Sequence, residues 1–237
     1  MLYRDHGIVL RTHKLGEADR IVVLCTERHG KVRAVAKGVR KTKSRFGGRL
    51  EPTSHVTLQL YEGLELDIVT QAESVDHFAA IRSDLDRLTR AVSMLEAVDQ
   101  IAQEREVNPD LYRMLLGALR SLSARNSNLV LAGFYWKVLA LEGFRPITEA
   151  CAVCGADGEL VAFDLHEGGV LCREHRRGTA MSADAVGLLR QILGGALAAA
   201  LDAPASPASA EVEHLATRAM EHHLERRLRS VGLLDKG

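Results

Sequence analysis

The 237-residue chain is poor in aromatic side chains and has no long apolar segment. Phe, Trp and Tyr make up 4% of the residues against 46% for all hydrophobic types, so the core must be largely aliphatic. No run approaches the roughly 18 apolar residues that a membrane-spanning helix needs. The first residues carry no apolar leader segment. We therefore expect a cytoplasmic protein that does not enter a membrane.

The chain also lacks the signatures of common hydrolases and metalloenzymes. It has neither an HExxH nor a GxSxG motif, and no paired carboxylates suited to acid–base work. Cysteine is scarce, and four residues of this type do not suggest a disulfide framework in a chain of this length. These absences favour a binding protein over an enzyme.

Net charge is absent as well, but the charges are segregated along the sequence. The 31 Lys and Arg cancel the 31 Asp and Glu. Residues 28–49 contain nine bases and no acid, whereas residues 51–110 contain thirteen acids and four bases. Segregation of this kind gives one face a positive field despite a neutral total.

Residues 6–75 are predicted to form a β-domain, because short runs of β-branched and apolar residues are separated by glycine-marked turns. The expected strands cover residues 8–10, 20–25, 31–37, 55–61 and 66–70. Five short strands in this space predict a small closed or half-closed barrel.

From about residue 80 the apolar period becomes helical. The Asn-Pro pair at 108–109 starts one helix, and residues 129–141, apolar nearly all round, predict a buried central helix. A linker at 203–210 precedes a last helix, which Ser209 can cap. We therefore expect an α+β protein with a barrel domain at 1–80 and a helical domain at 81–237.

A Gly- and Cys-marked insert at 148–180 interrupts the helical domain and has the spacing of a zinc knuckle. Its candidate ligands are Cys151, Cys154, Cys172 and His175, two pairs each separated by two residues. Four protein ligands leave no coordination position for water, so the zinc would be structural. The alternative is a pair of reduced buried thiols beside an unrelated histidine. His166 is a possible substitute ligand that lacks the spacing.

The basic segment predicts a nucleic-acid interface. The candidate residues are Lys31, Arg33, Lys37, Arg40, Lys41, Lys43, Arg45, Phe46 and Arg49. Lys31, Arg33 and Lys37 fall on one face of a strand because side chains alternate, and Phe46 is available to stack on a base. A cationic strand face beside a basic loop is how OB-fold barrels follow single strands. The alternative is an ordinary solvated loop.

Several segments together resemble the RecO family of recombination mediators. In the N-terminal third these are residues 7–12, 16–22, 26–31, 36–41, 44–48, 50–52 and 71–73; in the second half they are the cysteine pairs with Phe163 and Gly168-Gly169. Many family members have cysteine as the fourth ligand, so His175 is a departure. The resemblance covers nearly the whole chain.

The resemblance implies a protein that binds single- and double-stranded DNA and anneals complementary strands. It would work with RecR to help the RecA recombinase displace single-strand-binding protein in the nucleoid, without making or breaking a bond. A zinc-containing OB-fold RNA-binding protein is the alternative that composition leaves open. A nuclease is disfavoured because no clustered acids could hold its metals.

Overall fold

The computed structural model describes residues 1–42, 44 and 46–228 and divides them into two compact units. The first unit runs from Met1 to Ala124, and the second begins at Arg125. None of the helices in the described residues is both long and apolar enough to cross a bilayer.

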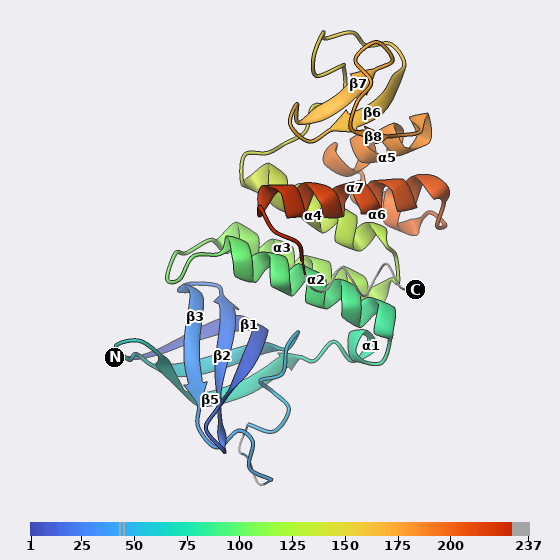
Figure 1. The fold of residues 1–237 in the computed structure, drawn as a ribbon. Helices are drawn as coiled ribbons and strands as arrows, with labels where there is room; N and C mark the ends of the chain where they lie inside the picture. The colour runs from blue at the N-terminus through green and yellow to red at the C-terminus, as the bar shows by residue number, and fades with distance from the viewer. Residues whose placement is uncertain (43, 45, 229–237) are drawn as a thin grey trace. The chain divides into compact units, whose positions relative to one another are not determined.

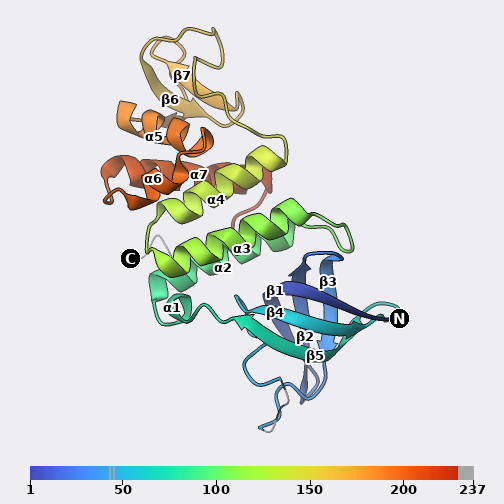
Figure 2. The same cartoon turned by 180° about the vertical axis from the view of Figure 1, so that it is seen from behind.

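Five strands of the first unit form a closed barrel (Figures 1 and 2). They are β1 (Leu2–Leu15), β2 (Asp19–Thr26), β3 (Gly30–Ala36), β4 (His55–Tyr61) and β5 (Asp67–Asp76). Their order is β1-β2-β3-β5-β4, and every neighbouring pair is antiparallel except β3 and β5. The long β1 pairs with both β2 and β4. The predicted five-stranded OB-fold barrel is confirmed.

Alternating aliphatic residues fill the barrel. In β3, Val32, Ala34 and Ala36 are buried while Arg33 is exposed, as alternation on a strand requires. Two residues of the β3–β4 connection, Phe46 and Leu50, complete the same core. The core of the barrel therefore contains side chains from a connecting loop as well as from the strands.

Three helices follow the barrel within the first unit: α1 (Ala79–Arg82), α2 (Leu85–Ile101) and α3 (Pro109–Ala124). The side chain of Asp84 caps α2 by accepting a 3.0 Å hydrogen bond from the backbone N–H of Arg87. Asn108 accepts one of 3.0 Å from the N–H of Leu111 at the start of α3. The helix start predicted at the Asn-Pro pair is confirmed.

The α2–α3 segment is joined to the barrel by polar contacts. Lys31 Nζ donates to the carbonyl of Asp99 (2.7 Å), and the backbone N–H of Arg105 donates to the carbonyl of Lys31 (3.0 Å). Arg105 also pairs with the fully buried carboxylate of Asp67 at 2.6 Å. The compact unit consequently extends to Ala124. The domain boundary expected near residue 80 stays a prediction.

The second unit combines four helices with a small sheet. Its elements are α4 (Leu129–Leu141), β6 (Leu160–Asp164), β7 (Gly169–Cys172), β8 (Thr179–Ala180), α5 (Ala183–Leu193), α6 (Leu197–Asp202) and α7 (Pro207–His223). Ten residues of α4 are buried, which confirms the predicted central helix. The non-helical insert forms a three-stranded sheet in the order β7-β6-β8.

The last helix begins earlier than the sequence suggested. Ser206, not Ser209, is its N-cap, and the two serines form a reciprocal capping box with hydrogen bonds of 2.9 and 3.1 Å. Because α7 begins at Pro207, the linker expected at 203–210 is reduced to residues 203–206.

Asp67→Ala should destabilise the first unit by about 2–4 kcal/mol, because Arg105 and the hydroxyl of Tyr3 lose their buried acceptor. Urea unfolding followed by circular dichroism measures the change. Asp110→Ala, which removes an exposed ion pair with Arg113, is the control and should cost less than about 1 kcal/mol. Equal effects of the two substitutions would contradict a structural role for Asp67.

Candidate nucleic-acid interface and metal centre

The two predicted DNA-binding residues within β3 are paired with acids. The side chain of Lys31 is only 14% exposed, and its Nζ lies 3.7 Å from a carboxylate oxygen of Asp99. Arg33 lies 3.5 Å from the carboxylate of Glu104. Both acids belong to the α2–α3 segment, which therefore covers this part of the strand. The structure does not leave Lys31 available as a contact for DNA.

The exposed cations lie in the connection between β3 and β4. Lys37, Arg40 and Lys41 are exposed, and within the described residues none of them is paired with a carboxylate. The connection is anchored near its start, since the backbone N–H of Gly38 donates to Asp19 Oδ1 (2.7 Å) and that of Arg40 to the carbonyl of Ala18 (3.0 Å). The predicted residues Lys43 and Arg45 lie outside the described residues.

Phe46 does not occupy the position expected of a base-stacking residue. Its side chain is 1% exposed and packs in the barrel core with Leu50 and Val69. Burying an aromatic ring in an aliphatic core is more favourable than leaving the ring in water. Nothing in the sequence of the basic segment indicated that Phe46 would be buried. The ring therefore anchors the connection, while Arg49 three residues later is exposed.

Two basic residues that the basic segment does not contain lie beside Arg49 in the fold. His77, just after β5, and Arg82, in α1, line the same depression as Gly47, Gly48 and Arg49. They lie outside the basic segment and within a stretch dominated by acids. Nothing in the linear pattern marked them.

The four predicted metal ligands meet in the second unit. One ligand atom from each of Cys151, Cys154, Cys172 and His175 lies within 4.8 Å of all the others. His175 Nδ1 is 3.3 Å from Cys172 Sγ and 4.0 Å from Cys151 Sγ, and the sulfurs of Cys154 and Cys172 are 3.9 Å apart. A tetrahedral ion with bonds of about 2.0–2.3 Å requires ligand separations of about 3.3–3.8 Å. The residues therefore fit a metal ion.

Local backbone structure prepares this cluster. The N–H of Gly155, at a positive φ of 73°, donates to the carbonyl of Cys151 (2.8 Å) and closes the first turn. Burial raises the pKa of the Cys151 thiol, but the backbone N–H groups of Cys172, Cys154 and Val153 lower it to about 6. The thiolate, which is the form that binds metal, is favoured at neutral pH. His166 is not part of the cluster.

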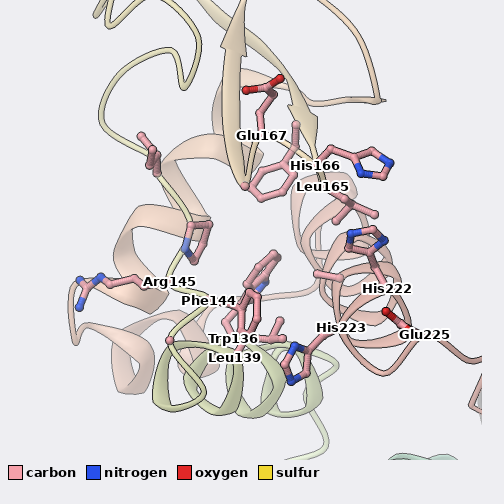
Figure 3. A pocket seen from close by; sticks show the side chains of 16 residues that line it. Trp136, Leu139, Phe144, Arg145, Leu165, His166, Glu167, His222, His223 and Glu225 are labelled. Atoms are coloured by element: carbon pink, nitrogen blue, oxygen red, sulfur yellow. The ribbon is translucent and has the colours of Figure 1, made fainter.

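A cavity of about 540 Å³ opens between α4, α7 and the β6–β7 turn of the second unit (Figure 3). Trp136, Phe144 and Leu139 form apolar walls, and His166, His222 and His223 are among its polar residues. The indole Nε1 of Trp136 is buried without a hydrogen-bond partner in the described residues. An acceptor on a bound group would satisfy this donor.

Comparison with known proteins covers both units. The family described as "Recombination protein O N terminal" matches residues 1–78, and "Recombination protein O C terminal" matches residues 82–231. A protein of Nocardioides sp. named DNA repair protein RecO is 45% identical over 245 aligned residues, which span the whole of both chains.

Cys154→Ala should abolish metal binding and lower the melting temperature of the second unit, because metal-binding free energy contributes to folding of the insert. Elemental analysis of protein purified without chelators, together with a thermal scan, measures both effects. His166→Ala is the matched control and should retain the metal. If His166→Ala loses the metal, His166 would be the fourth ligand in place of His175.

Proposed function

This chain belongs to the RecO family, and on that premise we propose that it is a recombination mediator that binds single- and double-stranded DNA through its barrel. The observation that carries the proposal is the exposed group Lys37, Arg40 and Lys41 on an anchored connection of an OB-fold. Phosphate contacts from such residues bind DNA without reading its sequence. The mediator would anneal complementary strands and make or break no bond.

Its partners would be those of the family. With RecR, the protein would help RecA to assemble on DNA coated by single-strand-binding protein, in the cytoplasm and at the nucleoid. An OB-fold RNA-binding protein is the alternative, and comparison of affinities for matched single-stranded DNA and RNA separates the two. Magnesium-dependent cleavage of labelled DNA by the purified protein would instead indicate a nuclease.

We propose that the metal is Zn²⁺ in a structural role. Three thiolates and one imidazole are the donors that zinc prefers in closed tetrahedral sites. When bound, the ion would stabilise the insert and supply no reactive water. Its ligands would connect the loop at Cys151 and Cys154 to the end of β7 at Cys172.

The tail of single-strand-binding protein, acidic and apolar in character, would dock on the second unit. The end of α7 offers exposed Arg226 and Arg227 close to the cavity lined by His222 and His223. The unpartnered indole N–H of Trp136 suits a carboxylate or carbonyl acceptor. Arg229, which follows in the sequence and is a third candidate for this contact, lies outside the described residues.

The logarithm of the binding constant for single-stranded DNA should fall linearly with the logarithm of the salt concentration. The expected slope is about −3 to −4, because each phosphate contact contributes about −0.7 and we expect about five contacts. Lys37→Ala with Arg40→Ala should flatten this slope by about one to two units and weaken binding to all sequences alike. The control removes two exposed arginines elsewhere, Arg113 and Arg173, whose side chains are 67% and 75% exposed. If the Lys37/Arg40 variant keeps wild-type affinity and slope, the barrel is not the DNA site.

Arg226→Glu with Arg227→Glu should abolish binding of a fluorescently labelled tail peptide, because both charges facing the acidic peptide are reversed. Fluorescence anisotropy measures the binding, and Arg113→Glu serves as the charge-reversal control. Trp136 is the single tryptophan, so its emission should also change when peptide enters the cavity. Undiminished anisotropy in the double variant would place the tail elsewhere.

A further inference from the structure

The face of β3 near Lys31 is closed to a nucleic-acid strand by the α2–α3 segment. Lys31 pairs with Asp99, Arg33 lies beside Glu104, and the N–H of Arg105 bonds to the Lys31 carbonyl. Figures 1 and 2 show the β3–β4 connection at the opposite end of the barrel from this contact. This contact blocks a strand held by Lys37, Arg40 and Lys41 from continuing along β3 past Lys31.

A depression of about 640 Å³ lies between the β3–β4 connection and the β5–α1 junction. Phe46 to Arg49 line one side of it, Glu73, Ser74 and His77 line another, and Arg82 completes it. The basic groups are Arg49, His77 and Arg82 and the acid is Glu73, so the two guanidinium groups alone outnumber the carboxylate. Four of the eight residues, Phe46 to Arg49, continue directly from the cationic connection.

Two features of the depression suit a phosphate. Arg82 is held in place by its Nη2, which donates to Ser54 Oγ (2.7 Å) and to the carbonyl of Pro52 (3.1 Å). A guanidinium fixed in this way loses little side-chain freedom on binding an anion. Arg49 and His77 add two further basic side chains to the same lining.

The backbone of Gly47 and Gly48 leaves room for a close approach. A Cβ at either position would meet no atom within 4 Å, so the glycines are not required by packing against the protein. Gly47 adopts a φ of 53°, which favours glycine, but Gly48 does not have a positive φ. Packing within the described residues therefore does not explain why position 48 is a glycine.

Backbone strain also borders the depression. Thr53 and Phe78 are non-glycine residues with positive φ, at 74° and 47°. Thr53 lies between the two residues that hold Arg82, and Phe78 follows His77. Such conformations persist only when the surrounding packing enforces them, and they concentrate at functional sites.

We propose that this depression is a phosphate subsite for the nucleic-acid strand that leaves the β3–β4 connection. The strand passes over Gly47 and Gly48, and one backbone phosphate lies between Arg49, His77 and Arg82. The subsite rests on the proposed DNA-binding function and adds a direction: the strand runs toward the β5–α1 junction and not along β3.

His77→Ala and Gly48→Ala test the subsite in the full-length protein. Binding of an oligothymidine of about 16 nucleotides, the upper end of the range for an OB-fold, is measured by anisotropy across a salt series. His77→Ala should weaken binding about three- to fivefold at low salt, because it removes a side chain that contacts the phosphate. Gly48→Ala should weaken it to a similar degree without changing thermal stability, because its methyl group obstructs the strand and no protein atom.

Matched controls separate this inference from the general proposal. His214→Ala removes an exposed histidine of α7, and Gly117→Ala adds a methyl group to an open glycine of α3; neither should alter DNA affinity. Wild-type affinity of both His77→Ala and Gly48→Ala, with weakened binding by the Lys37/Arg40 variant, would overturn the subsite alone. Wild-type affinity of all these variants would overturn the barrel as the DNA site.

Discussion

The contact between Asp99 and the barrel is the constraint on which the first unit depends. The nearly buried Asp99 carboxylate lies 2.6 Å from Arg11 Nε, and Lys31 bonds to the carbonyl of the same residue. These contacts fix α2 to β1 and β3, so that barrel and helices form one compact unit. Removing a buried acid from such a network leaves unpaired cations and costs far more than an exposed ion pair contributes.

The same contact explains how a chain without net charge can present a basic surface. Acids of the α2–α3 segment neutralise the cations at one end of β3, which are therefore structural. Lys37, Arg40 and Lys41 of the β3–β4 connection have no acid partner within the described residues and remain exposed. Charge segregation in the sequence thus becomes a spatial division, with paired bases at the helical end of the barrel and exposed bases at the other.

In the second unit, a different constraint acts on the insert. Three strands of two to five residues cannot bury a core of their own. Three thiols and an imidazole lie within 4.8 Å of one another, and a metal ion held by them would cross-link a glycine-stabilised turn to the end of β7. The spacing of the ligands was sufficient to predict this cluster, because each pair is separated by only two residues and forms on a local turn.

The sequence by itself determined the barrel, the central helix 129–141 and the metal cluster, since alternation, helical period and ligand spacing are local patterns. It did not determine which predicted DNA-binding residues are exposed. Phe46 is buried because it packs against the aliphatic side chains of the barrel core. Lys31 is paired because α2 places Asp99, 68 residues further along the chain, beside β3. Only the tertiary structure decided these positions and brought His77 and Arg82 beside Arg49, because long-range packing, unlike periodicity, leaves no mark on neighbouring residues.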